Sequence, residues 1–196
     1  MRSAGLRRLA ITGALACATG CRLSPPDVTP IRMIEPRLIE PSNRPATTTS
    51  ISPVPVRLLS TQARGHIGRR LLYQRAGGEL VEDQLWRWSS APDRYLDSAL
   101  RLALAAHPQI RLADAGTVPV MAATLLEWHL VSGTSTELAG AVELEITATD
   151  RTVRTYLLRG VEQASPDLPG NLADAAGRLL QRLAAQSVDK TMQALR

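Results

Sequence analysis

The 196-residue sequence contains no phenylalanine, and aromatic residues make up only 3% of it. A hydrophobic core therefore has to be built mainly from leucine, valine, isoleucine and alanine, which are sufficient for one domain of ordinary size. Lysine is almost absent too, since Lys190 is the only one and arginine supplies the other basic residues. These arginines are scattered rather than grouped in a stripe, which argues against nucleic acid as a partner.

The common enzyme signatures are also missing. The sequence has no HExxH, P-loop, GxGxxG or GxSxG motif. His66, His107 and His129 lie far apart, without a second ligand at metal-binding spacing. Glu143 and Glu145 share one face of an expected strand, and the alternation around them predicts a solvated face rather than a pair of catalytic carboxylates. We therefore expect no catalytic residues, no metal and no cofactor, and a protein that is not an enzyme.

A long apolar run is absent after the first twenty residues, so nothing beyond them is expected to span a membrane. The first twenty residues themselves have the pattern of a secretory signal. Arg2, Arg7 and Arg8 precede a short apolar run, and without these three arginines the formal net charge of +5 falls to +2. Residues 1–20 are therefore predicted to be a signal peptide.

Cys21 follows Ala18-Thr19-Gly20 and resembles the lipidated cysteine of bacterial lipoproteins. Its thiol would be diacylated and, after cleavage, would become the N-terminus, anchored in the membrane by two or three acyl chains. Two alternatives are an ordinary signal peptide cut nearby and an earlier lipobox that ends at Cys17. If Cys21 is lipidated and Cys17 is removed, disulfides, thiol catalysis and cysteine metal sites are excluded.

Residues 21–48 comprise the lipidated cysteine and a proline-rich tether, and residues 49–196 the folded domain. Six prolines between 25 and 45 disfavour both helix and sheet. At about 3.1 Å per residue in an extended polyproline conformation, this tether could hold the domain up to about 80 Å from the membrane.

Hydrophobic periodicity in the domain predicts the order β-β-β-α-β-β-β-β-α. Strands are expected at 50–59, 69–75, 80–85, 109–112, 118–131, around 142–146 and at 153–161. Ser90 opens a capping-box pattern before a helix that ends near His107, and Asn171 is expected to cap a final helix. Gly65-His66-Ile67-Gly68 predicts a bend before a strand rather than a phosphate-binding loop.

These elements predict an α/β protein of the α+β type, with a mainly antiparallel sheet and two helices packed on one face. The proline-bearing strand 50–59 and the long strand 118–131 are the expected free edges. Such edges could pair subunits into a homo-oligomeric ring, although the edge prolines are equally consistent with a monomer.

Several short motifs occur in a recognisable order between residues 55 and 92. Tyr73 and Arg75 end one strand, a glycine hairpin follows, and Trp86 and Trp88 precede the helix that begins near Pro92. This pattern resembles the ABC-type transport auxiliary lipoprotein family, the group that includes the paraquat-inducible C lipoprotein. The tryptophan–proline spacing is one residue longer than in that family. Aromatic residues at such positions are more often core anchors than ligand contacts.

The resemblance implies an auxiliary subunit of an envelope lipid ABC transporter, outer-membrane-anchored and periplasmic. Its partners would be a mammalian-cell-entry-domain protein and the transporter subunits, with the lipid anchor as its membrane attachment. The alternative is a structural or assembly adaptor lipoprotein for secretion or cell-wall machinery, because one fold can serve both roles.

We predict that the anchor lies in the outer membrane. Arg22 follows Cys21, whereas in many enterobacterial lipoproteins an aspartate at that position resembles a signal for retention in the inner membrane. Sucrose-gradient fractionation should place the protein with outer-membrane markers. Sedimentation with inner-membrane markers would contradict this placement.

Overall fold

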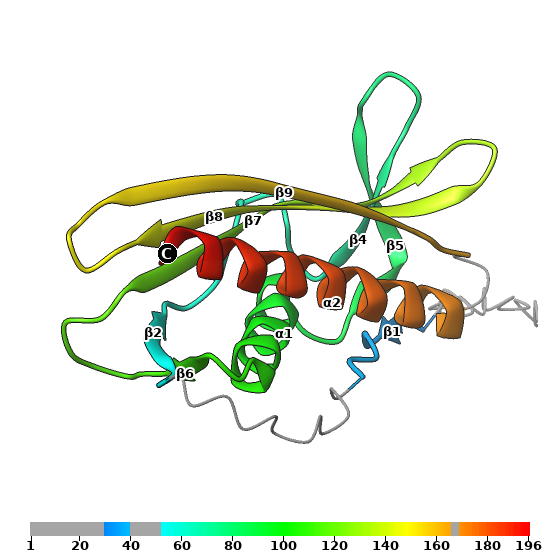
Figure 1. Ribbon diagram of the computed structural model, residues 1–196. Helices are drawn as coiled ribbons and strands as arrows, with labels where there is room; N and C mark the ends of the chain where they lie inside the picture. The colour runs from blue at the N-terminus through cyan, green and yellow to red at the C-terminus, as the bar shows by residue number, and fades with distance from the viewer. Residues whose placement is uncertain (1–29, 40–51, 166–168) are drawn as a thin grey trace, which may run out of the picture.

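The computed structural model describes residues 30–39, 52–165 and 169–196, which form nine strands and two helices (Figure 1). The strands are β1 (Arg32–Ile34), β2 (Val54–Leu58), β3 (Gln62–Ala63), β4 (Arg70–Gln74), β5 (Leu80–Trp88), β6 (Ile110–Leu112), β7 (Val120–Ser132), β8 (Thr136–Thr147) and β9 (Val153–Gln163). The helices are α1 (Pro92–Ala106) and α2 (Pro169–Ala194). The predicted order is confirmed from α1 onward, and the short strands β1 and β3 are additions before it.

Strands β7, β8 and β9 form the antiparallel part of the sheet. Val142, Leu144 and Ile146 on β8 are buried beneath the helices, while Glu143 and Glu145 between them are exposed on the opposite face. The period-2 alternation in the sequence is thus confirmed as a sheet with one covered and one solvated face.

The other edge of β7 is parallel, so the expectation of a mainly antiparallel sheet is wrong for this part of the fold. Strands β2, β3 and β4 follow one another along β7 in the same direction, and each pairs with it in parallel. Strands β1 and β5, and β2 and β6, are parallel pairs as well. The sheet is mixed because α1 acts as a crossover that returns the chain to the end of the sheet where it started.

The pairing also corrects the predicted edges. Strand β7 lies between β8 on one side and β2, β3 and β4 on the other, and β2 pairs with both β6 and β7. Neither 50–59 nor 118–131 therefore supplies a free edge. Strand β9 pairs only with β8 among the strands of the described residues and is an edge of the sheet.

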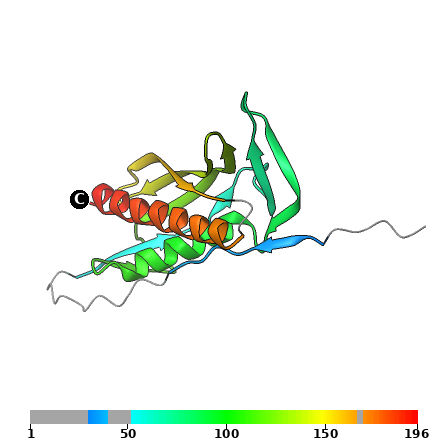
Figure 2. The ribbon, with the colours of Figure 1, turned by 90° about the vertical axis from the view of Figure 1, so that its right-hand side faces the viewer.

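Both helices lie on one face of the sheet, as predicted. Helix α2 crosses β8 and β9, and α1 lies beside it against β6 and β7. Figure 2 shows the two helices on the same side of β7–β9, with the β4–β5 hairpin rising at one end of that sheet. The core between these layers is built mainly from leucine, isoleucine, valine and alanine, with Trp88 and Trp128 at its centre.

The two predicted helix caps are wrong. Ala91 is the N-cap of α1 and makes no side-chain cap hydrogen bond. The Ser90 backbone N–H instead donates to the Tyr95 hydroxyl at 2.7 Å, one turn into the helix. Helix α2 is already formed at Pro169, so Asn171 lies in its first turn and its side-chain oxygen accepts from the Ser165 N–H at 2.7 Å.

Two glycines on neighbouring strands make room for α2. Gly140 on β8 and Gly160 on β9 are register partners. A Cβ atom at Gly160 would lie 2.7 Å from Leu179 Cδ1, and one at Gly140 would lie 3.1 Å from Leu179 Cδ2 and 3.3 Å from Leu183 Cδ1. The pair therefore forms a depression in the sheet that receives two leucines of α2.

The described N-terminal segment, residues 30–39, lies within the predicted tether 21–48 but packs on the domain, so the expectation of an extended tether is wrong for these residues. Strand β1 pairs with β5, and the Ile34 side chain is buried in the core. The Arg37 backbone N–H then donates to the Ala173 carbonyl of α2 at 3.2 Å. A Cβ atom at Gly177 would lie only 2.0 Å from the Arg37 carbonyl oxygen. Glycine at this point lets the segment cross the helix in backbone contact.

We predict that Gly140→Val and Gly160→Val each lower the free energy of unfolding by about 1–3 kcal/mol, because the new side chain displaces Leu179 from its depression. Gly133→Val in the β7–β8 turn is the matched control, since the nearest atom to a Cβ there is 3.7 Å away. Its effect should stay within about 0.5 kcal/mol in denaturant unfolding. Equal effects at all three positions would contradict this account.

Candidate functional site

The aromatic residues singled out by the sequence lie around the β4–β5 hairpin. Trp88 is fully buried, and its ring lies 5.7 Å from that of Trp128, centroid to centroid. Tyr73 is half-buried and packs against the core. Trp86 is also half-buried, and the Arg32 guanidinium of β1 lies 5.2 Å from its ring centroid, a distance typical of a cation–π contact. These three side chains thus connect the hairpin to the core and to β1.

Arg75 stands apart from these aromatic residues. Its side chain is exposed at the hairpin turn and pairs with Glu79 at 3.8 Å. An exposed ion pair of this kind contributes little to stability. Cys21, the predicted lipidation site, lies outside the described residues.

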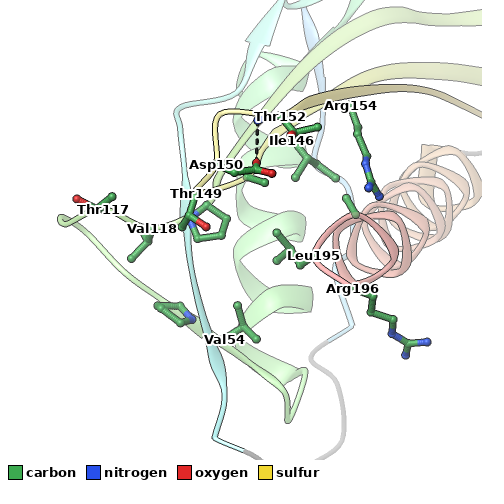
Figure 3. Close-up of a pocket in the computed structure, with 14 residues that line it drawn as sticks. Val54, Thr117, Val118, Ile146, Thr149, Asp150, Thr152, Arg154, Leu195 and Arg196 are labelled. Atoms are coloured by element: carbon green, nitrogen blue, oxygen red, sulfur yellow. Dashed lines mark hydrogen bonds between the residues drawn. The ribbon is translucent and has the colours of Figure 1, made fainter.

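One end of the domain carries a hollow of about 510 Å³ (Figure 3). The start of β2, the loop before β7, the β8–β9 turn and the last residues of the chain line it. Apolar side chains form part of its wall, among them Val54, Val118, Ile146 and Leu195. Arg154, Arg196 and Asp150 add charge. The arrangement can hold a ligand that has both an apolar and a charged part.

Hydrogen bonds fix two of these charged side chains. The Thr152 backbone N–H donates to Asp150 Oδ1 at 2.9 Å (Figure 3). This bond, together with one from the Thr152 hydroxyl, lowers the pKa of Asp150 below its ordinary value. The Arg154 guanidinium donates to the Gln193 carbonyl of α2 at 3.4 Å. The carboxylate is therefore ionised near neutral pH and its side chain is held in place.

The face of β7–β9 opposite the helices is a second candidate site, and we call it the open face. On the edge strand β9, Val153, Leu157 and Val161 recur at every fourth residue and are 54%, 55% and 49% exposed. Since successive strand residues point to opposite sides, these three side chains share the open face. A row of exposed apolar residues on an edge strand is typical of a protein contact surface.

The open face also contains a buried histidine. His129 on β7 is 7% exposed, and its neighbour Glu127 pairs with Arg159 of β9 at 3.4 Å. Burial lowers the pKa of His129, the nearby Glu127 raises it, and the nearby His66 lowers it. Removal from water is the largest of these effects, so the folded protein favours the neutral imidazole.

Within the part of the chain that the structure describes, no three histidine, cysteine, aspartate or glutamate side chains gather as a metal-ligand set. Neither of the described helices combines the length and the apolar character needed to cross a membrane.

The sequence did not point to either candidate surface, because the hollow collects residues from four separate segments. The row on β9 could have been found as an apolar residue at every fourth position of a predicted strand.

Comparison with known proteins identifies similar folds. No family model matches the chain, and no curated protein matches it. Among solved structures, a protein from Xanthomonas campestris assigned to the family DUF330 is similar, with a TM-score of 0.64 and 15% identity over 84% of this chain and 97% of its own. An uncharacterized protein matches with a TM-score of 0.60 and 12% identity over 84% and 99%. A hypothetical protein from Chlamydia trachomatis has a TM-score of 0.54 and 13% identity over 71% and 95%. At these identities the likeness shows a shared fold.

We predict that the free energy of unfolding falls as the pH is lowered through about 6.5. The unfolded chain takes up a proton on His129 at its ordinary pKa, whereas the folded chain resists protonation until a lower pH, so stability rises with pH in this window. Denaturant unfolding between pH 7.5 and 5.5 should show this slope in the natural protein and a weaker one in His129→Gln. An equal slope in both proteins would contradict the assignment.

Proposed function

We propose that the chain is a lipid-anchored periplasmic lipoprotein that serves as an auxiliary subunit of an envelope lipid ABC transporter of the mammalian-cell-entry type. The signal pattern that ends at Cys21 supports the anchor, and the motif order between residues 55 and 92 supports the transporter role. The shared fold with the DUF330 protein is consistent with this proposal.

The observation that carries the proposal is the exposed apolar row on the open face, Val153, Leu157 and Val161. An auxiliary subunit without chemistry of its own has to act by contact, and this row offers a contact surface at a sheet edge. Glu127 and Arg159 form an ion pair beside it, which gives the surface an apolar part flanked by charge. Such a combination is usual in protein interfaces.

Strand addition at the edge of β9 is restricted at one end. The Arg182 guanidinium of α2 donates to the Val161 carbonyl at 3.0 Å and also pairs with Glu162. Charged side chains at a sheet edge are a known device against uncontrolled pairing. We therefore expect contact through the side chains of the open face rather than through a continuous intersubunit sheet. If the protein forms a homo-oligomer, we expect its subunits to meet through this face and not through strands 50–59 and 118–131.

We predict that the full-length protein, crosslinked in intact envelopes and purified through a C-terminal tag, is recovered with an ABC permease, its ATPase and a mammalian-cell-entry-domain protein. Leu157→Arg should reduce this recovery at least tenfold, because it places a charge in the centre of the apolar row. Mass spectrometry of the crosslinked material gives the measurement.

Leu102→Arg on α1 is the matched control, since Leu102 is also an exposed leucine, at 37% exposure, but lies away from the open face. It should leave the recovery unchanged. Recovery of peptidoglycan synthases or secretin subunits in place of the transporter would overturn the proposal and favour the adaptor role. Equal losses with both variants would show that the open face is not the contact surface.

A further inference from the structure

The β4–β5 hairpin carries a second hollow, of about 530 Å³, on its side away from the core. We call it the arginine hollow. Its lining comes from the two strands and from the loop before β4, and comprises Gly65, His66, Gly68, Arg69, Arg70, Leu72, Leu80, Glu82 and Arg87. Neither the motif residues of the hairpin nor the proposed contact through the open face uses this hollow.

A bulge in β5 assembles the hollow. Leu72 pairs with Glu82, but Arg70, only two residues earlier, pairs with Arg87. The additional residues of β5 loop out around Asp83, whose Oδ1 accepts hydrogen bonds of 2.7 Å each from the backbone N–H groups two and three residues later. Glu82 and Arg87 are thereby brought to the same side of the hairpin, next to Arg70.

Positive charge exceeds negative charge in the arginine hollow. Arg70 pairs with Glu82, which is the only carboxylate among the lining residues. Arg69 donates through Nε to the Trp88 carbonyl at 3.2 Å. Arg87 Nε is buried and has no hydrogen-bond partner in the described structure. Two like charges opposite each other on paired strands destabilise a sheet, and so does a buried N–H group without an acceptor. An anion in the hollow would relieve the repulsion between the Arg70 and Arg87 guanidinium groups.

The hollow also has an apolar part. Leu72 points away from the core side of β4, where Leu71 lies, yet is only 5% exposed. Leu80 lies beside it across the hairpin and is 39% exposed. Met33 of β1, the register partner of Arg87, is 48% exposed. Apolar surface therefore borders the guanidinium groups.

We propose that the arginine hollow binds a phosphate-bearing anion whose phosphate group is held by Arg69, Arg70 and Arg87 and whose apolar part contacts Leu72 and Leu80. Guanidinium groups offer paired N–H donors in a planar fork that matches two phosphate oxygens.

The position of the hollow favours a phospholipid headgroup over free phosphate, a choice that rests on the proposed lipid anchor at Cys21. Pro30 lies nine residues after Cys21, so fully extended chain can separate them by at most about 30 Å. Pro30 lies two residues before the start of β1, which pairs with β5 at Trp86–Trp88 beside the hollow. The anchor thus keeps this end of the domain close to the membrane surface.

The test is calorimetric titration of the full-length lipidated protein in nonionic detergent with three probes. These are inorganic phosphate, dihexanoyl phosphatidylglycerol, and uncharged dihexanoylglycerol. We expect the phospholipid to bind and the uncharged lipid not to bind. Arg87→Gln should weaken phospholipid binding at least tenfold, and Leu80→Ser should weaken it without affecting phosphate. Phosphate binding as tight as that of the phospholipid would identify free phosphate as the ligand.

The matched control is Arg75→Gln, an arginine on the same hairpin that pairs with Glu79 outside the hollow. It should bind as the natural protein does. Without ligand, Arg87→Gln should also raise the melting temperature by about 2 °C or more, because it removes the Arg70–Arg87 repulsion. Equal binding of all three probes, or unchanged affinity in Arg87→Gln, would overturn the proposal. Neither result depends on whether the protein associates with a transporter.

Discussion

The close approach of α2 to the sheet is the constraint on which the rest of the structure depends. Gly140 and Gly160 are neighbours across β8 and β9, and Leu179 occupies the space that their side chains would take. With no phenylalanine and few aromatic residues, the chain cannot fill a wide gap between helix and sheet with large rings. Its core is instead made dense by bringing the layers together, so that small leucine and alanine side chains suffice.

The two core tryptophans connect the contact between α2 and the sheet to strands β5 and β1. A Cβ atom at Gly140 would also lie 3.2 Å from the Trp128 ring, which packs against Trp88 at the end of β5. Trp88 in turn is the register partner of Ile34 on β1. One continuous set of contacts therefore runs from the glycine pair under α2, through the two tryptophans, to the N-terminal segment. Trp128 Nε1 is buried without a partner, which is a cost of using tryptophan at a site that needs a ring.

The sequence predicts those features that depend on a single segment of the chain, and it misses those that depend on which segments meet. The alternation around Val142 and the helical spacing after Pro92 each depend on one segment, and the elements they predict are confirmed. Strand direction depends on which segments meet, and nothing in the pattern of 50–59 shows that it lies parallel to β7. The Ser90 cap failed because Ala91, extended before Pro92, is the N-cap, and the Ser90 N–H donates to the Tyr95 hydroxyl instead. Strand β1 was missed because three residues among prolines carry no period.

The arginine hollow shows the same limit for a candidate site. Arg70 and Arg87 are seventeen positions apart, and a regular hairpin with the register of Leu72 and Glu82 would not place them opposite each other. The bulge at Asp83 brings Arg70 and Arg87 opposite each other. No pattern in the sequence alone marks the position of this bulge. Like charges opposite each other on paired strands lower the stability of a sheet, and the one carboxylate among the lining residues, Glu82, pairs with Arg70. The Arg70–Glu82 pair compensates only part of this broken local rule, and the positive charge left over marks the hollow as a candidate ligand site.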